Sequence, residues 1–300
     1  MEQSLRIGID LGGTKTEIAA FDAHGKQLLR RREPTPATDY AATLALIARL
    51  IADAERELGA RATIGIGTPG ALSPSSGLMR NSNSTCLNQQ PVKVDLERTL
   101  GREVRLANDA NCFALSEAVD GAAAGAATVF GVILGTGTGG GIVIDGKVID
   151  GPNAIAGEWG HNPLPWPEDD ERPGAPCYCG KHGCIETFLS GPGLARDYAY
   201  LSGNTLSAEA VAARIEHDAT AAAALARYEN RCARALASVI NLLDPQVIVL
   251  GGGVSNIGRL YTNVPALWGR WVFSDVVRTR LARNVHGDSG GVRGAAWLWQ

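Results

Sequence analysis

The pattern that most constrains the fold of this chain is a strand, a glycine-rich turn and a second strand, found twice. Apolar segments at residues 5–11 and 16–21 flank the turn Gly12–Lys15, and a third strand is predicted after Gly25. The same order returns from residue 129, where Gly135–Gly141 precedes a short apolar strand and Asp145-Gly146 predicts a hairpin turn. The sequence therefore predicts two related halves of mixed α and β structure.

Helical and strand patterns extend both halves. In the first half, residues 40–58 have helical apolar spacing between Asp39, an N-cap candidate, and Gly59. Strands at 64–67 and 103–107 follow, and the second of these leads into an alanine-rich helix ending near residue 119. In the second half we expect helices within residues 186–243, a strand at 247–250, a helix after the glycines at 251–253, and a final helix over 291–300 whose tryptophans serve in packing. Glycine and alanine at 121–127 suggest a boundary, so the expected lobes are residues 1–120 with 289–300, and residues 121–288.

Composition limits the class of protein. Three hundred residues with 45% hydrophobic content can form one large or two ordinary domains. A formal net charge of -3 without long charged runs argues against nucleic acid and anionic membranes as partners. The start has no basic region before an apolar stretch, and no apolar run approaches the ~20 residues of a membrane span. A cytoplasmic protein is expected.

Three of the six cysteines lie within eight residues, which indicates a metal site rather than a disulfide framework. Cys177, Cys179 and Cys184 with His161 make a Cys3His set, which closes the tetrahedral shell of a structural Zn²⁺. His182 is an alternative fourth ligand, although its neighbours would strain so short a loop, and iron is an alternative metal. The other cysteines, Cys86, Cys112 and Cys232, are expected to be buried and inert.

The two glycine-rich turns allow several interpretations. Gly135, Gly137 and Gly140 fit the dinucleotide-binding spacing, but that mechanism needs a helix after the glycines, and β-branched residues follow here. The first turn has Thr14 where a P-loop would have its lysine. Two hairpin tips with successive free backbone N–H groups can still hold phosphates from opposite sides of a cleft.

A second group of polar residues surrounds these turns in sequence. Asn108 and Asp109 stand at a strand-to-helix junction, where capping is the ordinary role and catalysis the alternative. Glu158, His161 and Glu186 flank the predicted metal loop. Polar side chains fixed beside a rigid metal loop are suited to binding sugar hydroxyls, which need donors and acceptors at set distances.

Four segments together resemble the ROK family of sugar kinases and repressors: Asp10–Thr14, Leu134–Gly141, Gly157–His161 and Cys177–Glu186. The resemblance runs from Ile7 to the final helix. Other segments look most like bacterial fructokinases, also called manno(fructo)kinases: residues 81–85, 118–122, 160–166 and 286–290. Residues 108–117 are similar to the N-acetylglucosamine kinases of the same family.

The resemblance implies an α/β, actin-like (ribonuclease H-like) fold of two lobes with ATP and sugar in the cleft between them. It assigns Asp109 as general base and Asp10 to Mg²⁺. It gives His161 a double role, with one ring nitrogen on zinc and the other toward the sugar. The implied sugar-binding residues are Gly70, Asn108, Asp109, Glu158, His161 and Glu186. The implied ATP-binding residues are Gly12, Gly13, Thr14, Lys15, Gly135, Thr136, Gly137, Thr138 and Gly139 around the phosphates, and Gly251, Gly252 and Gly253 near the adenosine.

The expected function is therefore an ATP-dependent kinase acting on the 6-hydroxyl of free fructose, with mannose as a further substrate. N-acetylglucosamine or glucose kinase activity is the alternative, and N-acetylmannosamine remains a possible substrate. A sugar-sensing repressor is disfavoured, because the chain enters its first strand by Leu5 and leaves no room for a helix-turn-helix module. ATP, Mg²⁺ and structural Zn²⁺ are the expected cofactors, and a homodimer is expected from the family.

Overall fold

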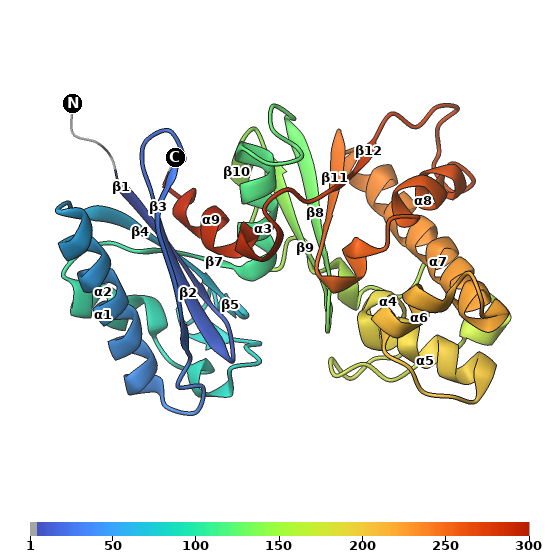
Figure 1. Ribbon diagram of the computed structural model, residues 1–300, viewed down its shortest axis with the longest axis horizontal. Coiled ribbons are helices and arrows are strands. Elements are labelled where there is room, and N and C mark those ends of the chain that lie inside the picture. The colour runs from blue at the N-terminus through green and yellow to red at the C-terminus, as the bar shows by residue number, and fades with distance from the viewer. Residues whose placement is uncertain (1–4, 300) are drawn as a thin grey trace.

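Two five-stranded sheets of the same strand order organise the chain (Figure 1). The computed structural model describes residues 5–299. The first sheet has the order β3-β2-β1-β4-β7 and the second β10-β9-β8-β11-β12. In both, the first three strands are antiparallel neighbours and the last two strands join in parallel. Both predicted strand-turn-strand openings are present, and the α/β, actin-like fold class is confirmed.

The strands have the following bounds. The first sheet contains β1 (Leu5–Leu11), β2 (Lys15–Phe21), β3 (Gln27–Pro34), β4 (Ala62–Thr68) and β7 (Arg105–Asn108). The second contains β8 (Thr128–Leu134), β9 (Thr138–Ile144), β10 (Lys147–Val148), β11 (Val247–Gly251) and β12 (Arg280–Arg283). A small hairpin, β5 (Ala71–Leu72) with β6 (Met79–Arg80), follows β4.

Helices α1 (Tyr40–Leu58) and α2 (Val92–Leu100) pack on one face of the first sheet (Figure 1). The start of α1 is fixed as predicted, because the Asp39 side chain accepts a hydrogen bond from the Ala42 N–H. Gly59 ends the helix in the left-handed conformation with φ 64°. Helix α2 was not predicted from the sequence.

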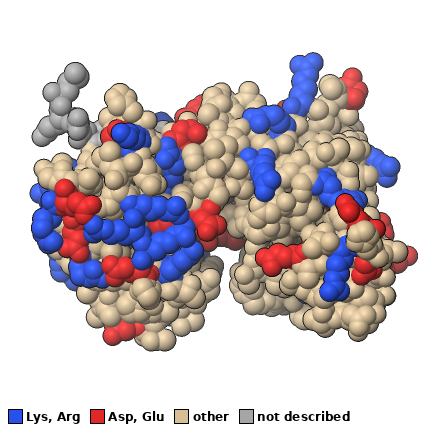
Figure 2. Space-filling model, viewed as in Figure 1, with Lys and Arg blue, Asp and Glu red and all other residues tan. Residues whose placement is uncertain are grey.

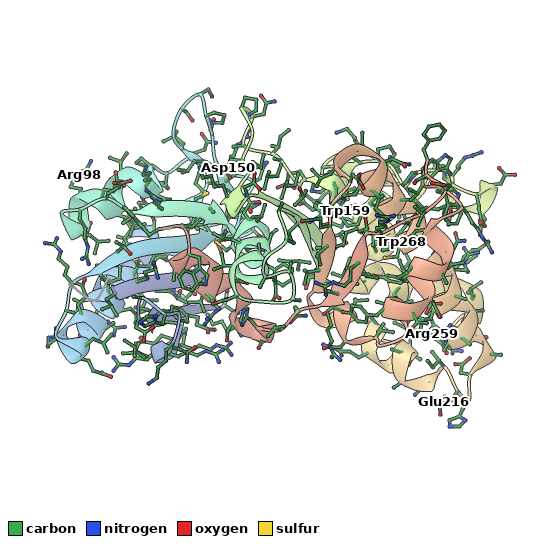
Figure 3. All side chains as sticks on the ribbon, turned by 90° about the horizontal axis from the view of Figure 1, so that it is seen from above. Arg98, Asp150, Trp159, Glu216, Arg259 and Trp268 are labelled. Carbon is green, nitrogen blue, oxygen red and sulfur yellow. The ribbon has the colours of Figure 1, made fainter. Side chains whose placement is uncertain are left out.

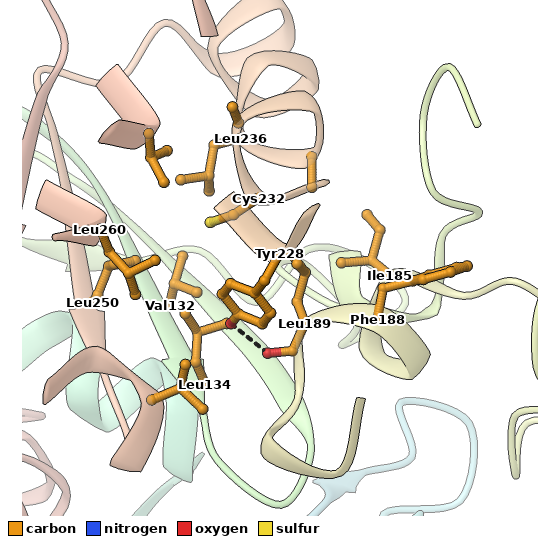
Figure 4. Packing of buried hydrophobic residues seen from close by; sticks show 14 of the residues in the cluster. Val132, Leu134, Ile185, Phe188, Leu189, Tyr228, Cys232, Leu236, Leu250 and Leu260 are labelled. Atoms are coloured by element: carbon orange, nitrogen blue, oxygen red, sulfur yellow. Dashed lines mark hydrogen bonds between the residues drawn. The ribbon is translucent and has the colours of Figure 1, made fainter. Parts of the chain in front are cut away.

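The second lobe is covered by five helices. They are α4 (Ile185–Leu189), α5 (Gly191–Ser202), α6 (Ala208–Arg214), α7 (Ala219–Leu243) and α8 (Leu260–Trp268). Tyr228, Cys232 and Leu236 of α7 join the apolar core that includes Val132 and Leu250 (Figure 4). The buried Tyr228 hydroxyl donates to the Leu189 carbonyl at 2.7 Å, so this core contains no unpaired phenol.

Helices α3 (Asp109–Val119) and α9 (Gly290–Ala296) lie between the two sheets (Figure 1). Their backbones almost touch, since a Cβ on Gly294 would lie 1.6 Å from the Cys112 carbonyl oxygen. Trp297, just after α9, is 7% exposed and stacks on Phe21. The expectation that this tryptophan serves in packing is confirmed.

Some boundaries differ from the predicted ones. The second glycine-rich segment is part turn and part strand, because β9 already begins at Thr138. A glycine is needed there for close approach, since a Cβ on Gly141 would lie 2.5 Å from the Ala110 carbonyl oxygen of α3. After Gly252 comes only a short 3-10 helix, η4 (Gly253–Asn256), before α8 begins. The final helix ends at Ala296, and Gln300 lies outside the described residues.

Within residues 5–299, no helix is long and apolar enough to cross a membrane. The lobe boundaries proposed from the sequence, residues 1–120 with 289–300 and 121–288, stay a prediction.

Candidate active site and metal centre

The first group of predicted site residues meets at one edge of the first sheet. Parallel pairing sets Asp10 of β1 beside Gly67 of β4, and Thr68 beside Asn108 of β7. The carboxyl ends of these strands therefore carry Asp10, Gly70 and Asn108 to the same edge, where ligands of open α/β sheets usually bind. Gly70 has φ 85° and a Cβ there would lie 2.4 Å from the Arg80 carbonyl oxygen, so the turn after β4 requires glycine.

Asn108 and Asp109 form the first turn of α3. The Asn108 side chain caps the helix by accepting from the Asn111 N–H at 2.7 Å, which confirms the capping interpretation for this residue. Asp109 Oδ1 accepts from the Ala110 N–H at 2.8 Å. The Asp109 side chain is exposed, and it is oriented by the helix start rather than by an ion pair.

The carboxylates at this edge influence one another. Burial raises the pKa of Asp10 to about 6, with further contributions from the charges of Asp109 and Glu17. Desolvation also raises the pKa of Asp109, even though its carboxylate is open to the cleft, because protein surrounds it on the other sides. Such a group of neighbouring acids is suited to a divalent cation and to accepting a proton.

The second glycine-rich turn lies at the corresponding edge of the second sheet. Gly135–Gly137 connects β8 to β9, and pairing of Ile133 with Gly251 places the end of β11 beside it. The turn is held by the Gly135 N–H donating to the Gly137 carbonyl at 2.9 Å. The Gly191 N–H of α5 donates to the Gly135 carbonyl at 2.8 Å, which ties the turn to the start of α5.

A cavity of about 820 Å³ opens beside this turn. Gly135 and Thr136 line it on one side and Gly253 on another. The remaining walls come from α5, from α6 with its flanking residues, and from η4 with the segment after it: Gly191, Pro192, Ala195, Ser207, Ala208, Glu209, Ala212, Ile215, Val254, Asn256, Ile257, Gly258 and Arg259. A cavity of this size, continuous with a backbone turn suited to phosphates, fits a nucleoside.

The other two glycines predicted near adenosine serve packing in this structure. A Cβ on Gly251 would lie 2.6 Å from the Phe113 ring, and one on Gly252 would lie 2.4 Å from the Leu134 carbonyl oxygen. Neither lines the cavity. Their contact with nucleotide stays a prediction.

His161, Cys177, Cys179 and Cys184 come together in one cluster, with all four ligand atoms within 4.8 Å of one another. His161 Nδ1 lies 3.5 Å from Cys177 Sγ, and the sulfurs of Cys179 and Cys184 lie 3.6 Å apart. Ligands about 2.1–2.3 Å from a tetrahedral zinc are themselves about 3.5–3.8 Å apart, so these residues fit that metal. His182, the alternative ligand, lies outside the cluster, and its backbone forms an isolated β-bridge with Pro176.

Glu186 connects the metal loop to the second glycine-rich turn. Its Oε2 accepts from the Thr138 N–H at 2.9 Å, while its Oε1 lies 4.0 Å from Cys177 Sγ. A Cβ on Gly137 would lie 2.6 Å from the same Oε2, so the turn is closed around the carboxylate. The predicted role of Glu186 in binding a sugar hydroxyl stays a prediction, and this link was not expected from the sequence.

The remaining predicted sugar residues face the space between the lobes. Figure 2 shows this cleft on one face of the molecule. Glu158 is exposed, and its pKa is raised by desolvation and by the charges of Asp109 and Glu186. Trp159, next along the chain, and Asp150 lie near the junction of the lobes in Figure 3. Glu158 is therefore near enough to Asp109 and to Glu186 for both charges to act on its carboxylate.

Two residues at this site were missed in the sequence analysis. Arg80 of β6 donates to the Asn153 carbonyl and so links the first lobe to the loop before Glu158. Tyr178 places its hydroxyl 2.9 Å from His161 Nε2, the nitrogen expected to face the sugar. In the sequence, the one signal for Tyr178 is its position between Cys177 and Cys179. No local pattern indicates Arg80 or the residues that line the cavity, because segments far apart in the sequence bring them together.

Comparisons with known proteins agree with this arrangement. The model of the ROK family matches residues 6–300. The N-acetyl-D-glucosamine kinase of Pectobacterium atrosepticum is 39% identical over 299 residues, covering 97% of each chain. Among solved structures, a ROK hexokinase from Thermus thermophilus has a TM-score of 0.87 at 32% identity, covering 98% of this chain and 97% of that one. A ROK family glucokinase from Streptomyces griseus, in complex with glucose and AMPPNP, has a TM-score of 0.76 at 28% identity, with coverage of 98% and 99%.

Proposed function

The chain belongs to the ROK family, and on that premise we propose that it transfers the γ-phosphoryl group of ATP to the 6-hydroxyl of N-acetyl-D-glucosamine. That it is an ATP-dependent sugar kinase follows from the family and from the hexokinase likeness. The choice of sugar is supported by the N-acetyl-D-glucosamine kinase relative, which aligns with nearly the whole chain. This favours the alternative stated above over fructose.

Fructose is the second candidate. Residues 160–166, Gly-His-Asn-Pro-Leu-Pro-Trp, look like the corresponding segment of bacterial fructokinases, and they surround His161. A pocket that hydrogen-bonds one sugar rejects analogues when its polar groups are left unpaired, so loop geometry decides between the two sugars.

The observation that carries the proposal is the position of Asp109. It lies at the sheet edge shared with Asp10, and its charge raises the pKa of both Asp10 and Glu158. An exposed carboxylate of raised pKa, held by its helix start, is suited to accept the hydroxyl proton as the sugar oxygen attacks phosphorus. Asn108, Gly70 and Glu158 are the neighbours proposed to bind and orient the other sugar hydroxyls.

Phosphoryl transfer asks the protein mainly to position reactants and offset charge. The turns Gly12–Lys15 and Gly135–Gly139 supply backbone N–H groups and Lys15 a positive charge toward the phosphates, and the 820 Å³ cavity takes the nucleoside. Asp10 is the carboxylate placed to hold the Mg²⁺ that accompanies ATP and offsets phosphate charge.

His161, Cys177, Cys179 and Cys184 would hold a structural Zn²⁺ that fixes the loop 161–186. His161 Nδ1 faces this cluster, which leaves Nε2 for the sugar. Through its bond to the Thr138 N–H, Glu186 then couples the sugar side of the loop to the ATP side.

A coupled assay of ADP release across N-acetylglucosamine, fructose, mannose, glucose and N-acetylmannosamine tests the proposal. N-acetylglucosamine should give the highest kcat/KM. A higher kcat/KM for fructose would change the proposed substrate but leave the proposed kinase activity intact. If no hexose stimulates ADP release, the proposed kinase activity itself is wrong.

A further inference from the structure

Tyr178 has an unusual position in the metal loop. It stands between two predicted metal ligands, yet its side chain is 82% exposed. Its hydroxyl lies 2.9 Å from His161 Nε2, and its ring meets the imidazole edge-on with the centroids 5.0 Å apart. The loop thus fixes the backbone of Tyr178, while the side chain is held on the protein mainly through His161.

His161 has one ring nitrogen to offer a sugar. Its Nδ1 faces the cysteine cluster, 3.5 Å from Cys177 Sγ. When Nδ1 of a histidine is on a metal, Nε2 carries the proton and acts as a donor. One N–H makes one well-aligned hydrogen bond, so the Tyr178 oxygen and a sugar hydroxyl oxygen compete for the same proton.

The surroundings of the phenol are those of the proposed sugar site. Desolvation, followed by the charges of Glu186 and Glu158, raises the pKa of Tyr178 to about 12. At 2.9 Å from Nε2, the phenol oxygen can accept the imidazole proton much as a sugar hydroxyl oxygen does. Glu186 approaches the same loop, with its Oε1 4.0 Å from Sγ of the neighbouring Cys177.

We propose that the Tyr178 hydroxyl occupies the place of a sugar hydroxyl on His161 in the sugar-free protein, and that the sugar displaces it on binding. The inference rests on the proposed function, because it assigns His161 Nε2 to the sugar. An 82% exposed side chain loses little packing when it turns outward, and the backbone need not move. Tyr178 is thus a residue that lowers sugar affinity while it keeps His161 oriented.

Calorimetric titration of sugar without ATP tests this, using Tyr178→Phe, wild type and Tyr200→Phe. Tyr200 is a matched control because it is 74% exposed and lies on α5, away from the metal loop. Removing the competitor should tighten sugar binding about 2- to 10-fold, the range of one net hydrogen bond, at unchanged zinc content and unchanged KM for ATP. Unchanged or weaker sugar binding by Tyr178→Phe would overturn the proposal.

The imidazole NMR signal of His161 Nε2–H separates this inference from the proposed function. Without sugar, the signal should differ between wild type and Tyr178→Phe, and at saturating sugar the two proteins should coincide. A difference that persists at saturation, or none without sugar, contradicts displacement. If no hexose moves the wild-type signal, the assignment of His161 to the sugar fails, and displacement fails with it, while the sugar-free comparison still decides whether the Tyr178 hydrogen bond exists.

Discussion

Asp10 and Asp109 place two carboxylates at one sheet edge, where each is also desolvated by the surrounding protein. A carboxylate whose pKa is raised in the folded protein lowers the stability of the folded state once it ionises. The arrangement is unfavourable for the protein alone and favourable once a cation or a substrate proton is present. The carboxylates at this site are therefore expected to lower the stability of the ligand-free protein while they serve its function.

Replacing Asp10 by Asn should stabilise the ligand-free protein at high pH and not at low pH. Burial raises the pKa of Asp10 from its ordinary value of 3.8 to about 6 in the folded protein, so the stability cost grows as pH rises from about 4 to about 6 and is constant above that. At about pH 8 the variant should gain about 1–2 kcal/mol, less than the full shift implies because the side chain is partly solvated. Thermal melts without ATP or Mg²⁺ measure it; a gain that is equal at every pH would contradict this cause.

At the scale of elements, local signals were the predictable ones. Helix α1 carries its own N-cap at Asp39 and its own stop at Gly59, so sequence was sufficient to place it. The start of β9 and the brevity of α9 depend on contacts with other segments, as does the cavity built from α5, α6 and η4. The metal cluster was predictable because three of its ligands lie in one short loop, and the fourth follows from chemistry.

The predicted zinc of the loop 161–186 can be tested directly by measuring the metal content of the protein. Purified protein should contain about one zinc per chain. Stripping it should weaken sugar binding before ATP binding, because His161 belongs to the cluster while the 820 Å³ cavity does not. Elemental analysis with calorimetric titrations of sugar and of an ATP analogue measures both.

Cys86→Ser is the matched control for the metal, since Cys86 is a free, half-buried thiol outside the cluster. It should keep its zinc, whereas Cys179→Ser should lose it. Active protein without any transition metal would exclude the site. Equal loss of sugar and ATP affinity on stripping would mean that the metal only holds the lobe together.

At the scale of the whole molecule, both chain connections between the sheets meet at one residue. The fully buried Glu117 carboxylate accepts from the Ala122 N–H, in the connection to β8, and from the Val285 and His286 N–H groups, in the connection to α9. Close by, Arg293 of α9 and His286 both form hydrogen bonds with the Asp120 carboxylate. These hydrogen bonds hold the two connections between the sheets together at one place.

Glu117→Gln should therefore destabilise the protein by about 1–3 kcal/mol, because an amide offers one acceptor oxygen and turns a donor toward backbone N–H groups. The midpoint of urea unfolding measures the change. Glu103→Gln, at an exposed carboxylate, should stay within about 0.5 kcal/mol of wild type. An unchanged midpoint for Glu117→Gln would show that the two connections do not depend on this carboxylate.

The repeated strand-turn-strand pattern made the two-sheet architecture predictable, and the resemblance to the family gave the cleft. Sugar identity could not be predicted in the same way, since it depends on how loops such as 149–166 lie over the sheet edges. The central claim is nevertheless independent of that identity: Asp109, at the edge of the first sheet, accepts the proton of whichever hydroxyl is phosphorylated.

Turnover by Asp109→Asn tests this claim most directly. The variant should fold, keep its zinc and bind sugar, while kcat falls by about 10²–10⁴-fold, the usual contribution of a general base. Steady-state ADP release at saturating sugar and ATP measures it, with calorimetric sugar binding as the control for the intact site. Near-normal kcat in a variant that still binds sugar would remove Asp109 from the role of base.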